Sequence, residues 1–179
     1  MIVQLCGMSG AGKSALARFA EHKLLENGYP VEVLDENDLR HQLFKDLGMS
    51  LEDQAQNIRR MAWLANRFSR HGIFTILCAI NPLDRIRLEI QYQYRIAATI
   101  EIDCALEELI RRDTEGRYKR AYLPEGHPDK ITGLSGVNGV FEHPLKPDLI
   151  IRTHQETEAE SGQRLYEFLL PLALGAAIR

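Results

Sequence analysis

The sequence predicts one α/β domain in three layers, in which helices cover both faces of a central parallel β-sheet. Three observations lead to this prediction. Short apolar runs alternate along the chain with longer segments of helical periodicity. The apolar runs are nearly continuous, which is typical of strands that are buried on both faces. A glycine-rich loop joins the first apolar run directly to the first helical segment.

The expected strands are short and rich in β-branched residues, and turn residues bound several of them. They cover residues 2–6, 31–34, 73–79, 99–102 and 149–151. The expected helices carry apolar residues at intervals of three or four. They cover residues 14–26, 51–71, 105–112 and 156–170. On the second helix, Met61, Trp63 and Phe68 are expected in the core.

Length and composition indicate an ordinary globular domain that spans residues 1–179. The formal net charge of −3 excludes the basic surface expected of a protein that coats nucleic acid. One segment, residues 113–147, is rich in charge, Gly and Pro and lacks sustained periodicity, and its part at 113–130 has few apolar anchors and four cations, Arg117, Lys119, Arg120 and Lys130. Such a segment is typical of a lid over a ligand, and a solvated surface loop is the alternative.

Cysteine usage and the chain ends bear on the compartment. Cys6, Cys78 and Cys104 form no CxxC pair, so neither a disulfide framework nor a zinc ribbon is expected, and all three are expected to be buried. The first residues lack the basic segment of a signal peptide. The late apolar run at 168–178 is too short to span a membrane. We therefore expect a cytoplasmic protein without a membrane partner.

Residues 7–14 read GMSGAGKS and fit the pattern G-x-x-x-x-G-K-[ST] of a phosphate-binding P-loop. In this pattern successive backbone N–H groups bind phosphates at the start of a helix. Lys13, expected to be exposed until nucleotide binds, reaches the β- and γ-phosphates, and the Ser14 hydroxyl binds Mg²⁺. The motif predicts a P-loop NTPase fold that uses ATP and Mg²⁺; a glycine-rich turn without a ligand is the alternative. The expected ATP-binding residues of the loop are Gly7, Ser9, Gly10, Ala11, Gly12, Lys13, Ser14 and Ala15.

The second expected strand ends in the polar segment VLDENDLRHQL at residues 33–43. Residues at the carboxyl ends of parallel strands face the ligand crevice. Asp35, Asn37, Asp38 and Arg40 are therefore expected beside an acceptor, with Asp35 also placed to bind Mg²⁺. The alternative for Asp35 is a solvated helix cap. Farther along the chain, Arg85 and Arg87 either reach a substrate phosphate or lie on a solvated helix face.

Several blocks occur in the order found in adenylylsulfate (APS) kinases, namely GMSGAGKS, LDENDLRHQL, KDLGMSLEDQAQNIRR, AINP, RRDTEGRYKRA, TGL and FEHP. The chain resembles that family from Met1 to about residue 170. The resemblance implies a kinase that moves the γ-phosphate of MgATP to the 3′-hydroxyl of adenosine 5′-phosphosulfate in sulfate assimilation. It also implies a homodimer and a mobile lid.

The resemblance assigns roles to residues outside the phosphate loop. Arg112 matches a residue beside the ATP adenine, and Lys119 and Arg120 match lid residues that close over the phosphates. Asn57 and Arg40 match residues that orient the acceptor. Lys13, Asp35, Arg40 and Lys119 make up the implied catalytic set.

The acceptor side departs from the family pattern. Asn37 stands where the family has a second acidic residue, Met49 and Ile131 replace two aromatic rings that stack on the acceptor adenine, Gln54 replaces an arginine, and Asn81 replaces a serine. Stacking is worth about 1–3 kcal/mol per base. These changes indicate an acceptor pocket that differs from the family's.

Three functions remain open from the sequence. The first is an APS kinase. The second is a kinase of the same family for another nucleotide, such as cytidine diphosphoramidate in surface-polysaccharide synthesis. The third, a nucleotide-binding regulator without transfer activity, is disfavoured by the intact phosphate loop and lid.

Overall fold

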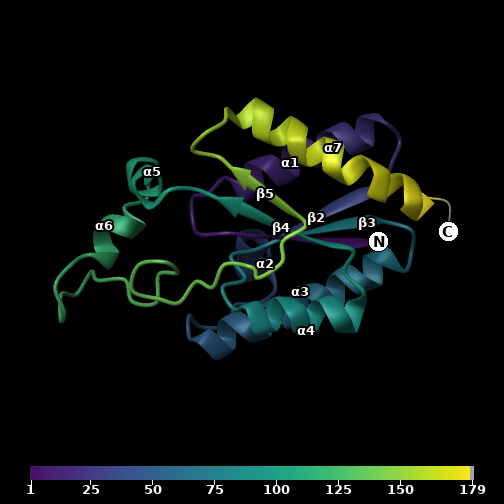
Figure 1. The fold of residues 1–179 in the computed structure, drawn as a ribbon. Coiled ribbons are helices and arrows are strands. Elements are labelled where there is room, and N and C mark those ends of the chain that lie inside the picture. The colour runs from purple at the N-terminus through teal and green to yellow at the C-terminus, as the bar shows by residue number, and fades with distance from the viewer. Residues whose placement is uncertain (178–179) are drawn as a thin grey trace.

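The computed structural model describes residues 1–177 and confirms the three-layer α/β fold. Five parallel strands form one sheet in the order β2-β3-β1-β4-β5. Helices α1 and α7 cover one face of the sheet, and α3 and α4 cover the other (Figure 1). The strands are β1 (Ile2–Cys6), β2 (Val31–Asp35), β3 (Phe74–Cys78), β4 (Ala98–Asp103) and β5 (Leu149–Arg152). The helices are α1 (Lys13–Glu26), α2 (Glu36–Gln42), α3 (Leu51–Ser69), α4 (Asp84–Tyr94), α5 (Leu106–Arg111), α6 (Arg117–Ala121) and α7 (Glu158–Ala177).

The five expected strands are confirmed within one residue at each end, whereas α2, α4 and α6 were not expected. Helix α2 has no buried residue, so it lacks the apolar stripe by which a helix is recognised in a sequence. Helix α6 has only five residues. Helix α7 continues through Pro171, beyond its expected end at residue 170.

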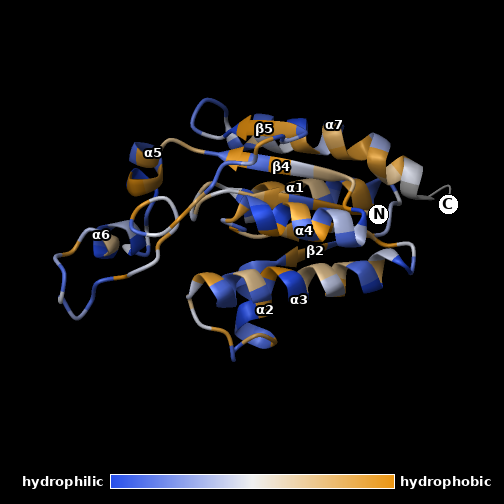
Figure 2. Ribbon diagram, turned by 60° about the horizontal axis from the view of Figure 1, so that its bottom comes forward, coloured by the Kyte–Doolittle hydropathy of each residue, from blue (hydrophilic) through white to orange (hydrophobic). Residues whose placement is uncertain are grey.

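Strand β1 shows how the sheet divides the core. Val3 and Leu5 belong to the cluster that packs under α1 and α7, whereas Ile2 belongs to the cluster under α3 and α4. This alternation follows from the two-residue period of a strand. Gln4 is buried on the same face as Ile2, beside Ile58 and Met61, and donates to Thr99 Oγ1 at 2.8 Å. Figure 2 shows the hydrophobic colour concentrated on the strands and α7.

Two expectations about single side chains were wrong or incomplete. Met61 is buried in the core as expected, but Trp63 is 56% exposed, because two residues along a helix turn the side chain to the opposite face. Arg87 is 1% exposed and fits neither alternative, since it donates to the backbone oxygens of Asn81 and Glu142, both at 2.5 Å. Its neighbour Arg85 is exposed.

The segment from residue 113 to 147 lies beyond the carboxyl ends of the strands and holds α6 (Figure 1). Its part at 113–130 has more apolar anchors than the sequence suggested, because Tyr118 and Ala121 are buried, and Leu134 is buried farther along. The Tyr118 hydroxyl donates to the backbone oxygen of Ser9 at 2.7 Å. Asn138 donates to the Ala121 and Ile131 oxygens and so holds the segment together. The segment therefore packs against the phosphate loop.

Two further expectations can be compared with the structure. Cys6, Cys78 and Cys104 are free and buried, as expected. Within residues 1–177, none of the helices combines the length and the hydrophobicity that a membrane crossing requires.

Candidate active site

The loop between β1 and α1 has a backbone path that only glycine permits at two positions. Gly7 has a φ of +151°, and a Cβ there would lie 2.2 Å from the backbone oxygen of Ile102 on β4. Gly12 caps α1 in the left-handed conformation, with a φ of 99°. The loop thereby turns its backbone toward the start of α1, where free N–H groups bind anions.

Lys13, the first residue of α1, is 9% exposed and not an exposed charge as expected. Its Nζ donates to the backbone oxygens of Gly7 and Met8, each at 2.9 Å. Burial lowers the pKa of Lys13, and the nearby groups Cys78, Glu36, Cys6 and Asp35 partly oppose this shift. The ammonium is thus held over the loop, where phosphate oxygens can replace its carbonyl partners.

Ser14 and Asp35 bring together the ends of the phosphate loop and β2. Ser14 Oγ donates to Asp35 Oδ2 at 2.5 Å, and Asp35 is 5% exposed. The other carboxylate oxygen accepts from the Asn37 N–H at 2.9 Å and caps α2. Asp35 is therefore a helix cap, as the alternative had it, but a buried one that contacts the phosphate loop.

The oxygen atoms of Ser14 and Asp35 suit Mg²⁺, which is bound by one or two carboxylates together with water and substrate phosphates. Within residues 1–177, three or more His, Cys, Asp or Glu side chains nowhere gather into a group able to hold a metal ion. A metal at this place would therefore depend on nucleotide phosphates for its remaining ligands.

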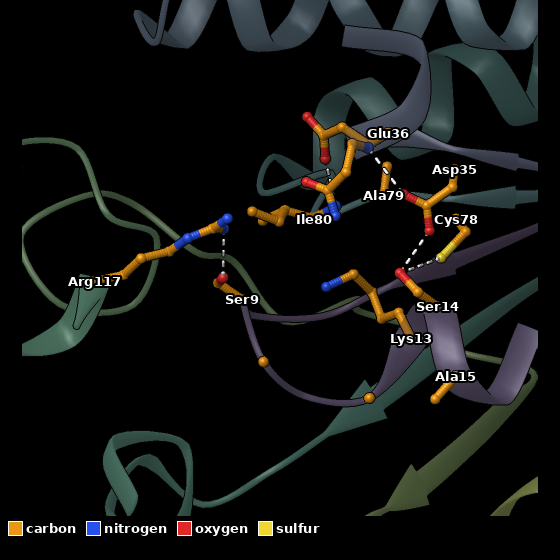
Figure 3. A pocket seen from close by; sticks show the side chains of 13 residues that line it. Ser9, Lys13, Ser14, Ala15, Asp35, Glu36, Cys78, Ala79, Ile80 and Arg117 are labelled. Carbon is orange, nitrogen blue, oxygen red and sulfur yellow. Dashed lines mark hydrogen bonds between the residues drawn. The ribbon is translucent and has the colours of Figure 1, made fainter. Parts of the chain in front are cut away.

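A cavity of about 240 Å³ lies between the phosphate loop and the carboxyl ends of β2 and β3 (Figure 3). Arg117, from α6, reaches the cavity from the opposite side, and its Nη1 donates to Ser9 Oγ at 3.3 Å. Burial raises the pKa of the Cys78 thiol to about 12, so this lining residue stays protonated near neutral pH. The lining consists of Ser9, Gly10, Gly12, Lys13, Ser14, Ala15, Asp35, Glu36, Asn37, Cys78, Ala79, Ile80 and Arg117.

A second cavity, of about 380 Å³, lies on the other side of the same loop. It is lined by Gly10, Gly12, Ala15, Leu16, Arg112, Thr153, Glu156 and Glu158. Arg112 donates to the backbone oxygen of Thr153 at 2.9 Å, and the Thr153 hydroxyl donates to the Ala11 oxygen at 2.9 Å. The phosphate loop thus separates two cavities. Two nucleotides can bind here, one in each cavity, with their phosphates directed toward the loop.

Glu36, whose function the sequence did not indicate, accepts hydrogen bonds from several groups at the side of the first cavity that lies opposite the phosphate loop. Its Oε1 accepts from Asn57 Nδ2 at 2.9 Å, and its Oε2 accepts from the Ile80 N–H at 2.9 Å. Arg40 Nε lies 3.4 Å from Oε1. Asn57 is fully buried, so its amide is fixed in this contact.

The remaining residues expected on α2 lie in different places. Asn37 lines the cavity. Arg40 lies outside the lining and donates to the Gly48 oxygen at 3.0 Å and to Met49 Sδ at 3.5 Å. The Asp38 side chain is 70% exposed and pairs with Arg18 on α1 at 3.5 Å. Asp38 is therefore not placed to take over the function of an acidic residue at position 37.

The other expected acceptor residues lie outside the cavity lining. Met49 is 59% exposed, and Gln54 Nε2 donates to its backbone oxygen at 2.8 Å. Asn81 is buried and donates to Gln4 Oε1 at 3.1 Å. Ile131 is partly buried against the core.

Among the cations of the expected lid, Lys119 and Arg120, which the resemblance assigned to the phosphates, are exposed, and Arg117 reaches the phosphate loop instead. The Arg117 N–H and the Tyr118 N–H both donate to the Asp113 carboxylate, at 2.9 and 2.8 Å. This cap sets the start of α6 and so the direction in which Arg117 points. The cluster of basic residues at 117–120 was the only indication in the sequence, and it did not show which of them would contact the phosphate loop.

Comparisons with known proteins agree on one family. The family model described as adenylylsulphate kinase matches residues 1–152. An adenylyl-sulfate kinase of Gloeothece citriformis is 37% identical over 163 residues, which cover 91% of this chain and 90% of that protein. An adenylyl-sulfate kinase of Chloroflexus aurantiacus is 38% identical over 153 residues, with 86% and 80% covered. The structure of an APS kinase of Mycobacterium tuberculosis, in complex with AMPPNP and APS, superposes with a TM-score of 0.85 at 33% identity and covers 94% of this chain and 96% of that one.

Proposed function

Because the chain belongs to the adenylylsulphate kinase family, we propose that it transfers the γ-phosphate of ATP to the 3′-hydroxyl of a small nucleotide. The observation that carries this proposal is the cavity shared by the phosphate loop and the end of β2. In it, Lys13 and the Ser14–Asp35 pair lie on one side, and Glu36 and Asn37 lie on the other. A donor phosphate on the loop therefore faces an acceptor beside α2.

We propose that the donor nucleotide binds at the phosphate loop and in the second cavity. Its phosphates bind the loop N–H groups and Lys13, and its base extends toward Arg112 and Thr153 in the second cavity. Mg²⁺ held by Ser14 and Asp35 would neutralise phosphate charge. Arg117 brings a guanidinium to the lid side of the cavity, where it is paired with Glu115 at 2.7 Å and can exchange this partner for a phosphate. These residues supply positioning and charge neutralisation, which dominate catalysis when the transition state is loose.

The residue at position 37 bears on whether a general base removes the proton of the attacking hydroxyl. An amide such as Asn37 cannot accept the proton of the attacking hydroxyl. The carboxylates that line the cavity, Asp35 and Glu36, are both bonded to protein donors. We therefore propose that Lys13, Arg117 and the loop amides contribute more to the rate than proton abstraction does.

Two acceptors are proposed for the site. APS is the substrate named for the relatives. A different nucleotide, such as cytidine diphosphoramidate in surface-polysaccharide synthesis, is favoured by the side chains at three of the five divergent positions. Met49 and Ile131 bring no aromatic ring, and Gln54 brings no positive charge. A homodimer and a cytoplasmic location also stay predictions, as do the mobility of the lid and the roles of Arg40, Lys119 and Arg120.

The test is a screen of ATP consumption against nucleotides with free 3′-hydroxyls, including APS and cytidine- and uridine-based acceptors. We expect MgATP turnover that depends on at least one acceptor, with the phosphate recovered on its 3′-oxygen. The Lys13→Ala protein is the control for contaminating kinases. Binding of MgATP without acceptor-dependent turnover across the panel would favour the regulator and contradict the proposed function.

A further inference from the structure

The carboxylate of Glu36 occupies the hydrogen-bond donors that an anionic acceptor would need. Asn57 Nδ2 and the Ile80 N–H each donate to it at 2.9 Å, from α3 and from the end of β3. Arg40, the cation nearest to it, lies 3.4 Å away and is also bonded to Gly48. Three donors that converge on the end of β2 are thus already satisfied by the protein's own negative charge.

The same cluster has hydrogen-bond acceptors to spare. A carboxylate offers about four acceptor positions, and the Glu36 contacts account for two short hydrogen bonds and one longer ion pair. The Glu36 side chain is 14% exposed and lines the cavity. Asn57 is fully buried and does not line the cavity, so its amide is not free to turn toward a ligand. A ligand group that lies directly against Glu36 therefore meets the free acceptor positions of the carboxylate, while Lys13 lines the same cavity on the side of the phosphate loop.

We infer that Glu36 determines the chemical class of the acceptor nucleotide. In APS the group attached to the 5′-phosphate is a sulfate, whose oxygens only accept hydrogen bonds. The acceptor that fits Glu36 carries at this place a group with an N–H or O–H donor. This inference rests on the proposed function and deepens it. Specificity is the difference between the binding free energies of the two ligands. A donor group gains a charge-assisted hydrogen bond to Glu36, whereas a sulfate, which has acceptors only, gains none.

Two acceptors with the same base, sugar and formal charge isolate this effect. They are APS and adenosine 5′-diphosphoramidate, which carries an amino group on its β-phosphorus where APS carries the sulfate oxygens. We expect the wild-type protein to show the higher kcat/KM with the diphosphoramidate. Glu36→Gln keeps the shape of the side chain but removes the charge, and we expect it to shift the kcat/KM ratio toward APS by about tenfold or more.

Glu32→Gln is the matched control, because Glu32 lies on the same β2 strand, is exposed and does not line the cavity. It removes the same charge, and we expect it to leave the ratio unchanged. A structural function of Glu36 alone would lower turnover with both acceptors equally, and such an equal loss contradicts the inference. An equal shift in the Glu32→Gln protein contradicts it as well.

A direct binding measurement keeps the inference testable if Glu36→Gln does not fold. Calorimetry with the wild-type protein and a non-hydrolysable ATP analogue gives the dissociation constants of both acceptors, and tighter or equal binding of APS overturns the inference. Failure of the proposed function is distinguishable. If the wild-type protein binds MgATP but transfers phosphate to no nucleotide, both proposals fall. If it transfers phosphate to both acceptors with a ratio that Glu36→Gln does not change, only the inference falls.

Discussion

The donor and acceptor sides of the cavity are built in different ways. The donor side is a backbone structure, in which Gly7 lies against β4 and the helix that follows buries Leu16, Ala17 and Leu24 in the core. The acceptor side is a network of side chains centred on α2, a helix without a buried residue, with partners on α3 and at the end of β3. A substitution on the donor side therefore disturbs the fold, whereas the acceptor side can change its chemistry with little effect on the core. Of the departures from the family pattern, Asn37 and Met49 lie in exposed positions, whereas Gln54 and Asn81 are buried.

Of the substitutions considered, Gly7→Ala should have the largest effect on the stability and nucleotide binding of the donor side. An alanine at a φ of +151° is strained, and its Cβ would meet the Ile102 oxygen at 2.2 Å. We expect a loss of stability of ~3 kcal/mol and no detectable binding of MgATP, measured by chemical denaturation and calorimetry. Gly28→Ala is the control for positive φ alone, because nothing lies within 4 Å of a Cβ there. Equal losses in the two proteins would show that the close approach to β4 is unimportant.

Lys13→Ala separates catalysis from folding on the donor side. We expect turnover to fall by about 10²–10³-fold, the effect of removing one preorganised donor of this kind. The Gly7 and Met8 oxygens lose a partner, but a desolvated charge also disappears. These two effects oppose one another, so the free energy of unfolding should change by no more than about 1 kcal/mol. Turnover within threefold of wild type would refute the assignment of the phosphate loop.

Met49→Phe sharpens the comparison from the acceptor side. Met49 is 59% exposed and its sulfur accepts one weak hydrogen bond from Arg40 Nη1 at 3.5 Å, so the melting temperature should hardly change. A new ring that stacks on an adenine is worth about 1–3 kcal/mol. We therefore expect the kcat/KM for APS to rise by about fivefold or more, with cytidine-based acceptors as the comparison. An unchanged value would mean that the acceptor base does not bind near residue 49.

Tyr118→Phe gives the smallest effect and tests how the segment at 113–147 is held to the donor side. The change removes the hydrogen bond from the Tyr118 hydroxyl to the Ser9 oxygen but keeps the buried ring. Burial raises the pKa of this hydroxyl to about 12, so the bond persists through the neutral range. We expect a loss of about 1 kcal/mol and faster proteolysis within the segment. Tyr122→Phe, at an exposed ring, is the control. Identical cutting patterns in the two variants would show that the contact with Ser9 does not anchor the segment.

The sequence by itself determined the sheet and the phosphate loop. Each strand is a short and mostly apolar run, and the loop motif is contiguous from Gly7 to Ser14. The information needed to recognise these elements therefore lies within a few residues. The place of Asp35 at the end of a parallel strand followed from the topology alone. The contact of Ser14 with Asp35 is the tertiary outcome of that topology.

The tertiary structure alone decided which side chains converge on the cavity. The Glu36 carboxylate meets groups that are 21 and 44 residues away in the chain. Arg117, and not Lys119 or Arg120, reaches the loop because the Asp113 carboxylate caps a five-residue helix. Arg87 is buried because two distant backbone oxygens accept from it. Such contacts depend on how loops from separate strands meet at one edge of the sheet. That arrangement is set by packing across the whole domain, which no local pattern in the sequence encodes.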